Sequence, residues 1–114
     1  MADQELAPFA LVETSAGNFS LLLSTFSPAD QVFERHGQSG GGYSWEGIAR
    51  HLIERADSGL EGRLKLDPES SMFCAYGPDR DALAELGRQM AALFHDAGRL
   101  EQRILEIGPA GFDD

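Results

Sequence analysis

The sequence predicts an α+β fold in which a four-stranded antiparallel sheet, built from two hairpins, carries helices on one face. Two β-prone runs flank the turn residues 15–18, and two more flank the turn residues 67–70. Turn residues between such runs indicate hairpins. Elsewhere the apolar residues recur at intervals of three and four, which is typical of amphipathic helices. The element order is hairpin, helix, helix, hairpin, helix, and helices that cover one sheet face are one of the stable layer arrangements.

The first hairpin pairs residues 8–14 with residues 19–25. In the second run, apolar and polar side chains alternate with the period of a half-buried strand. The apolar positions on one face are Phe19, Leu21 and Leu23.

A short helix follows the first hairpin. Ser27 can cap it, Pro28 suits its first helical position, and Asp30 supplies an acid in its first turn. Val32 and Phe33 then point inward.

The next helix is expected over residues 44–57, immediately after the glycine run Gly40–Gly42. Ser44 is the expected N-cap, because its hydroxyl can accept a first-turn N–H. The apolar stripe of this helix consists of Trp45, Ile48, Ala49, Leu52, Ile53 and Ala56.

The second hairpin pairs residues 60–66 with residues 71–76 around a turn that has Pro68 at its second position. The run 71–76 is nearly all apolar, so we expect a central strand that is covered on both faces.

A long helix begins at residues 77–79, with acidic residues near its positive end. Its apolar stripe consists of Leu83, Leu86, Met90, Leu93, Phe94 and Ala97. Residues 99–107 predict one further short helix. Residues 1–6 and 108–114 are expected to be flexible.

The whole chain, residues 1–114, is expected to form a single domain. It has 114 residues, 42% of them hydrophobic, and a single cysteine, which excludes an intramolecular disulfide bond. The N-terminus lacks the pattern of a signal peptide, and no apolar run approaches the ~20 residues of a membrane span. We therefore expect a cytoplasmic protein with no membrane partner.

The net charge of −10, from 19 acidic and 9 basic side chains, makes nucleic acid a poor partner. Binding to nucleic acid depends on Lys and Arg, which neutralise phosphates. A basic protein would be a good partner, because complementary fields speed association. The alternative is that the charge serves solubility alone.

No residues form a recognisable catalytic, cofactor-binding or metal-binding pattern. His36, His51 and His95 are isolated from one another and lack ligand spacing. Cys74 lies in the middle of a strand expected to be buried, where a thiol behaves as an inert hydrophobe.

Two motifs invite a chemical interpretation that their details do not favour. Gly40–Gly42 precede a helix and could cradle a phosphate, but the lysine of a phosphate-binding loop is missing and Glu46 already places negative charge there. Asp67 and Glu69 could act as an acid/base pair only if burial shifted a pKa, whereas a hairpin tip is usually exposed.

Tyr43 and Trp45 are candidate anchors for a protein partner, because Tyr and Trp are enriched in binding hot spots. Trp45 also begins the apolar stripe of its helix, which leaves burial in the core as the alternative. Tyr43 lies before the stripe and is the more open of the two.

Two stretches together resemble a known family. Gly41–Ala49, preceded by a short helix with Phe33 and Glu34, resembles the Gly-x-Gly-Tyr-x-Trp region of the immunity protein 51 family. Asp67–Tyr76 resembles the second motif of that family, Asp-Pro-Glu-x-x-Met-Phe followed by a strand and a helix. The resemblance spans residues 9–97, and its departures are small.

The resemblance implies a bacterial antitoxin that binds and neutralises a cognate protein toxin of a polymorphic toxin system. A basic, nuclease-like toxin would suit the charge of −10. The expected partner-binding residues are Tyr43, Trp45, Glu46, Asp67 and Glu69. The expected structural residues of the motifs are Gly41, Gly42 and Pro68.

Two other classes of protein stay open from the sequence. One is a small enzyme or ligand-binding domain with a site between the Gly40–Gly42 loop and the Asp67–Glu69 hairpin, which a deep cleft with convergent polar groups would reveal. The other is a scaffold that dimerises through a self-complementary apolar patch. The oligomeric state does not follow from the sequence.

Overall fold

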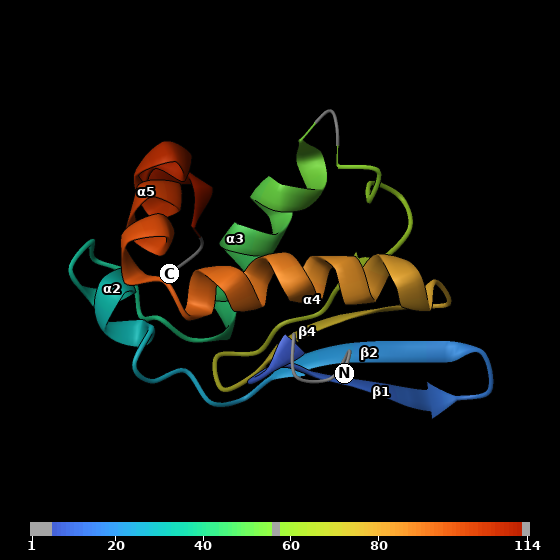
Figure 1. The fold of residues 1–114 in the computed structure, drawn as a ribbon. Coiled ribbons are helices and arrows are strands. Elements are labelled where there is room, and N and C mark those ends of the chain that lie inside the picture. The colour runs from blue at the N-terminus through green and yellow to red at the C-terminus, as the bar shows by residue number, and fades with distance from the viewer. Residues whose placement is uncertain (1–5, 56–57, 113–114) are drawn as a thin grey trace.

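The α+β fold is confirmed by the computed structural model, which describes residues 6–55 and 58–112. One open antiparallel sheet has the strand order β1-β2-β4-β3. Its strands are β1 (Ala10–Ser15), β2 (Asn18–Leu23), β3 (Lys65–Leu66) and β4 (Phe73–Gly77). The helices are α2 (Asp30–Glu34), α3 (Gly42–Glu54), α4 (Arg80–Phe94), α5 (Ala97–Ile107) and the short 3₁₀ helix η1 (Pro109–Gly111). Figure 1 shows the helices on one side of the sheet, with α4 lying over the strands and running roughly along β1 and β2.

Within residues 6–55 and 58–112 no helix covers the other face of the sheet, which corrects the expectation that β4 is covered on both faces. Phe73 and Ala75 of β4 are fully buried under the helices, whereas Tyr76 is 40% exposed and Cys74 is half-buried. Alternate residues of a strand point to opposite faces, so a single helical layer buries only one of the two sets.

β3 is much shorter than the expected run 60–66. The Arg63 N–H donates to the Leu60 carbonyl (3.1 Å), and Gly62 has a φ of 81°. This turn removes residues 60–63 from the sheet, because a positive φ does not fit an extended strand.

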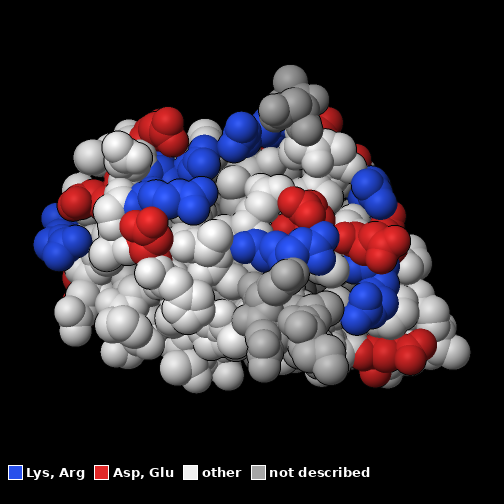
Figure 2. Space-filling view, viewed as in Figure 1, with Lys and Arg blue, Asp and Glu red and all other residues white. Residues whose placement is uncertain are grey.

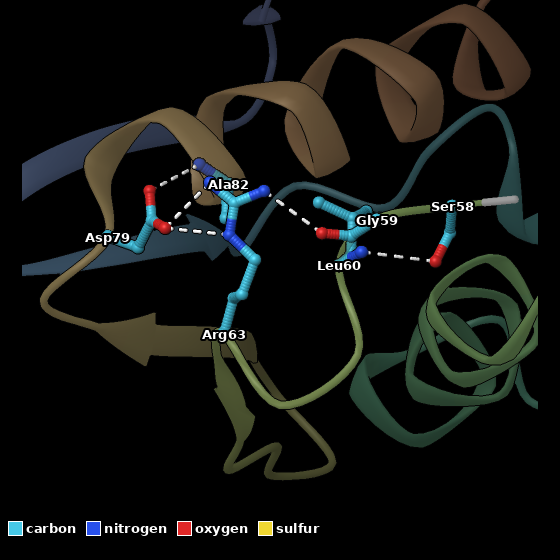
Figure 3. A network of polar contacts seen from close by, with 6 residues as sticks. All are labelled: Ser58, Gly59, Leu60, Arg63, Asp79 and Ala82. Atoms are coloured by element: carbon cyan, nitrogen blue, oxygen red, sulfur yellow. Dashed lines mark hydrogen bonds and ion pairs between the residues drawn. The ribbon is translucent and has the colours of Figure 1, made fainter.

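Arg63 connects this turn to the start of α4. Its Nε donates to Asp79 Oδ2 (2.7 Å) and its Nη1 donates to the Gly59 carbonyl (2.9 Å), as Figure 3 shows. Asp79 Oδ1 also accepts the Ala82 N–H (3.0 Å), so Asp79 is the N-cap of α4. These bonds, first the one from Ala82 and then the one from Arg63, lower the pKa of Asp79. The predicted start of this helix is thereby confirmed.

α2 begins later than expected. Its first residue is Asp30, its N-cap is Ala29, and no side chain caps it, so the expected cap by Ser27 is wrong. Val32 and Phe33 are buried, as the sequence predicted.

α3 also begins differently: its first residue is Gly42 and its N-cap is Gly41. Ser44 lies inside the first turn and is fully buried, and its hydroxyl accepts the N–H of Gly40 (2.9 Å). The hydroxyl therefore holds the preceding loop and does not act as the expected N-cap. α3 extends to Glu54, and the expected end of this helix at residue 57 lies outside the described residues.

Trp45 is fully buried at the centre of an aromatic cluster, so it is a core residue and not an exposed anchor for a partner. Its ring meets the edges of Phe9 (centroids 5.7 Å apart) and Phe33 (5.3 Å) and stacks on Phe94 (5.8 Å). Such pairs contribute about 0.5–1.5 kcal/mol each beyond the area they bury.

Both ends of the described chain pack onto this core, although flexible ends were expected. Leu6 is buried, and a Cβ on Gly87 of α4 would lie 2.7 Å from its Cδ2. Phe112 is buried beside Phe33 (6.1 Å) and over Gly47, where a Cβ would lie 2.5 Å from its Cδ1. The chain between Gly108 and Phe112 is thus part of the fold, while residues 1–5 and 113–114 lie outside the described residues.

The start of α3 rests directly on the turn of the second hairpin. The Gly42 N–H donates to the Ser70 carbonyl (3.2 Å). A Cβ on Gly42 would overlap the carbonyl oxygen of Glu69 and would lie 2.6 Å from that of Met72. Only glycine fits this contact between backbones.

We predict that Gly42→Ala lowers the free energy of unfolding by about 2–3 kcal/mol, because a methyl group there must push two backbone segments apart. Urea unfolding followed by circular dichroism measures the effect. Gly98→Ala is the matched control: Gly98 lies in the first turn of α5, and its Cβ would approach only Asp96 Oδ1, at 3.7 Å. The control should be neutral or slightly stabilising. Equal stability of the two variants would contradict the close contact.

Candidate functional site

Tyr43 is exposed at the start of α3. It follows Gly42, so its backbone lies beside the Glu69–Met72 turn, and the residue is 39% exposed. The expectation of an open position for Tyr43 is therefore confirmed.

Glu46 is less available to a partner than the sequence suggested. Its carboxylate forms an ion pair with Arg50 (Oε2 to Nη2, 3.0 Å), and only 15% of its side chain is exposed. The pair joins residues one turn apart on the solvent side of α3, a common arrangement for helix ion pairs.

Asp67 and Glu69 are both exposed, and Pro68 between them is half-buried. The backbone of the second hairpin fixes them: the Asp67 N–H donates to the Cys74 carbonyl (2.9 Å), and Glu69 and Met72 exchange two backbone hydrogen bonds (2.7 and 3.1 Å). Asp67 therefore stands opposite Cys74 at the edge of the sheet.

The charges of these carboxylates reach the open face of the sheet. The pKa of the Cys74 thiol is raised, first by burial, then by Asp67 and to a smaller extent by Glu69, while a hydrogen bond with Ser20 opposes the rise. A partly buried thiol beside negative charge stays protonated at neutral pH and is a weak nucleophile.

Apolar side chains lie on the same open face of the sheet. The register pairs Val12 with Ser20, Ser20 with Tyr76 and Tyr76 with Lys65, so the four residues form one row across the sheet. Val12 and Tyr76 are each 40% exposed. The sequence analysis missed both, although their position one residue away from buried strand residues was a usable signal.

We name the candidate site by five residues: Val12, Tyr43, Asp67, Glu69 and Tyr76. It combines two aromatic rings and an aliphatic side chain with two carboxylates, on strands and at a helix start. Trp45, which the sequence left between interface and core, does not belong to it because it is buried.

The glycine loop does not have the free donors that a phosphate site needs. The N–H groups of Gly40, Gly41 and Gly42 donate to Ser44 Oγ (2.9 Å), Ser39 Oγ (3.2 Å) and the Ser70 carbonyl (3.2 Å). At Gly42 the loop and the hairpin turn are in direct contact, which does not favour a ligand site between them.

His36 and His95 make their hydrogen bonds with residues outside the candidate site. His36 Nε2 lies 2.8 Å from Glu101 Oε2, and His95 Nε2 lies 2.7 Å from the Ala7 carbonyl oxygen. Among residues 6–55 and 58–112 no group of three or more His, Cys, Asp or Glu side chains is placed to hold a metal ion.

These observations define a small α+β protein. Its two sequence motifs, Gly41–Ala49 and Asp67–Tyr76, are in contact, and it exposes tyrosine and carboxylate side chains. The family model described as Immunity protein 51 matches residues 9–108, which is most of the chain. The chain therefore belongs to the immunity protein 51 family, as its two motifs indicated. No curated protein and no solved structure matches the chain.

None of the helices in the described part of the chain is both long and apolar enough to cross a membrane.

We predict that Asp67→Asn speeds the alkylation of Cys74 by iodoacetamide about two- to fivefold at pH 8. The raised pKa keeps the thiolate fraction low, and removing the Asp67 charge lowers the pKa and raises that fraction. The rate is measured by mass spectrometry between pH 7 and pH 9. Asp81→Asn, at an exposed position of α4, is the control and should leave the rate unchanged. An unchanged rate in Asp67→Asn would place that carboxylate away from the thiol.

Proposed function

We propose that this protein binds a cognate protein toxin in the cytoplasm and neutralises it by protein–protein contact, without catalysis. The observation that carries the proposal is the match of the immunity protein 51 family model over residues 9–108. An immunity function follows from the family, and the contact mechanism is the part that we add.

The candidate site offers a surface suited to this function. Tyr43 and Tyr76 are 39% and 40% exposed, and a tyrosine ring gains a large contact area at little cost in conformational entropy. Asp67 and Glu69 are exposed beside them and supply the negative charge that orients a basic partner. The apolar centre and the acidic edge are the two parts that a protein interface combines.

The charge of the chain favours a basic toxin, such as a nuclease-like enzyme whose active site attracts phosphates. At −10 the protein would accelerate the approach of such a partner at low ionic strength. Covering a basic active-site groove with carboxylates would exclude the anionic substrate. Neutralisation then requires binding alone.

A catalytic role has no comparable support. The thiol of Cys74 is held protonated by burial and by Asp67, which works against nucleophilic attack. The glycine loop, the focus of the alternative ligand-binding interpretation, has its N–H groups occupied by the chain itself.

The decisive experiment is to purify this protein with the toxin encoded beside its gene and to measure binding by calorimetry and protection by growth rescue. We expect a tight complex and restored growth. Toxin activity that persists at saturating concentrations of this protein would contradict neutralisation by contact.

We predict that Tyr43→Ala, and separately the double reversal Asp67→Lys with Glu69→Lys, weaken toxin binding roughly 10- to 100-fold, the range of a hot-spot loss. Affinity is measured by calorimetry on variants whose circular dichroism matches that of the parent protein.

Two control variants match these changes. Leu105→Ala removes a side chain that is 63% exposed on α5, and Glu61→Lys with Asp81→Lys reverses two exposed charges elsewhere. These controls should bind within about threefold of the parent, a difference below 1 kcal/mol. If the controls and the site variants lose affinity equally, the candidate site is not the contact surface.

A further inference from the structure

A second feature of the molecule is a cleft of about 620 Å³ where α3, α4 and α5 meet. Figure 1 shows these three helices converging above the sheet. The cleft is lined by four arginines, Arg55 after α3, Arg88 of α4, and Arg99 and Arg103 of α5. On the face drawn in Figure 2, basic side chains gather around this meeting point of the helices.

This concentration of positive charge contrasts with the rest of the chain. The four arginines are almost half of the nine basic residues, which leaves five for the remainder of a protein with 19 acidic residues. Among the described residues, Glu85 contributes the one carboxylate that lines the cleft.

Glu85 does not neutralise the cleft. Its two oxygens accept from Arg88 Nη2 (2.7 Å) and Gln89 Nε2 (2.9 Å), so it pairs with one arginine of the four. Arg55 also has an interaction partner. Arg103 Nη1 lies 3.5 Å from Glu106 Oε1, a carboxylate that is 61% exposed outside the cleft. Both pairs are partly exposed and contribute little to stability, although each offsets the charge of its own arginine.

Arg99 carries charge that the described part of the chain does not balance. Its backbone N–H bonds to Asp96 Oδ1 (3.2 Å), but its guanidinium makes no ion pair within residues 6–55 and 58–112. Like charges gathered in one cleft repel one another, and a bound anion would relieve that repulsion.

We propose that this cleft binds a small molecule bearing several phosphate groups, of about nucleotide size. Guanidinium groups donate paired hydrogen bonds that match the geometry of phosphate oxygens. A volume of about 620 Å³ is in the range of small-molecule sites. The site is additional to the toxin-binding surface and does not depend on that proposal.

The charge of the surroundings argues for a compact ligand. A long nucleic acid or an extended acidic peptide would reach beyond the cleft onto a surface that repels it, because acidic residues greatly outnumber basic ones in the rest of the chain. A small polyphosphate places its charge inside the cleft alone.

The test is isothermal titration calorimetry of the full-length protein with ATP in the absence of magnesium, with tripolyphosphate, and with adenosine as the uncharged comparison. We expect saturable binding of ATP and tripolyphosphate at one molecule per chain, and no binding of adenosine. Higher salt should weaken the binding, because the contacts are ionic.

The variants Arg99→Glu and Arg99→Gln locate the site. We predict at least a tenfold loss of ATP affinity in Arg99→Glu and a smaller loss in Arg99→Gln, which covers the case in which the charge reversal perturbs the fold. Arg80→Glu is the matched control, because Arg80 is an exposed arginine of α4 outside the cleft, and its affinity should change less than twofold.

Three results would overturn the proposal. The first is no heat of binding with ATP or tripolyphosphate at millimolar concentration. The second is an equal loss in Arg80→Glu and Arg99→Glu, which would make the effect one of net charge. The third is tighter binding of a hexaglutamate peptide than of either phosphate compound, which would assign the cleft to an acidic protein segment.

Discussion

The contact between Gly42 and the carbonyl groups of Glu69 and Met72 is the constraint from which the rest of the arrangement follows. It sets the first turn of α3 directly on the second hairpin, with no side chain between the two backbones. Residues of a helix advance by about 100°, so Tyr43 and Trp45 point in nearly opposite directions. The same contact therefore buries Trp45 among the aromatic rings of the core and leaves Tyr43 at the surface beside Glu69. The two family motifs are in contact at Gly42. This contact positions Trp45 in the core and Tyr43 in the candidate site.

The single helical layer has an equally direct consequence for the sheet. In the described part of the chain the helices lie on one side of the sheet, so strand residues that point to the other face, such as Val12 and Tyr76, stay exposed. On that face Val12 and Tyr76 are apolar and exposed, and Asp67 stands at the edge. Cys74 lies among them, but burial and the neighbouring carboxylates raise its pKa, so the face is suited to contact and not to covalent chemistry.

Local patterns predicted the elements whose signals lie in neighbouring residues. The hairpins follow from alternation and turn residues. α4 follows from its apolar stripe and from Asp79, whose side chain accepts the N–H of Ala82 three residues later and so caps the helix. The failures depend on distant residues. Ser44 looks like a cap, but Gly42 can begin the helix because the hairpin turn accepts its N–H. The sequence predicts a flexible tail at Phe112, but its ring packs against Phe33 of α2 and over Gly47 of α3, and both residues are distant in the sequence. The arginine cleft combines three helices, and sequence spacing alone does not bring them together.

The molecule has an acidic surface and an arginine-lined cleft, and the net charge of −10 alone does not reveal the cleft. The residues of the candidate site lie on the open face of the sheet, at the second hairpin and at the start of α3, whereas the arginine cleft lies within the helical layer, near the other end of α3. Opposite charges on one small domain attract unless structure keeps them apart, and here the sheet and the body of the helices lie between them. A toxin on the sheet and a phosphate compound in the cleft could therefore bind at the same time. One link between them is α3, whose first turn rests on the hairpin and whose last turn, at Leu52 and the following Arg55, borders the cleft. α4 is a second link, because it lines the cleft and packs on β2 and β4, so energetic coupling between the two sites has two helices along which to pass.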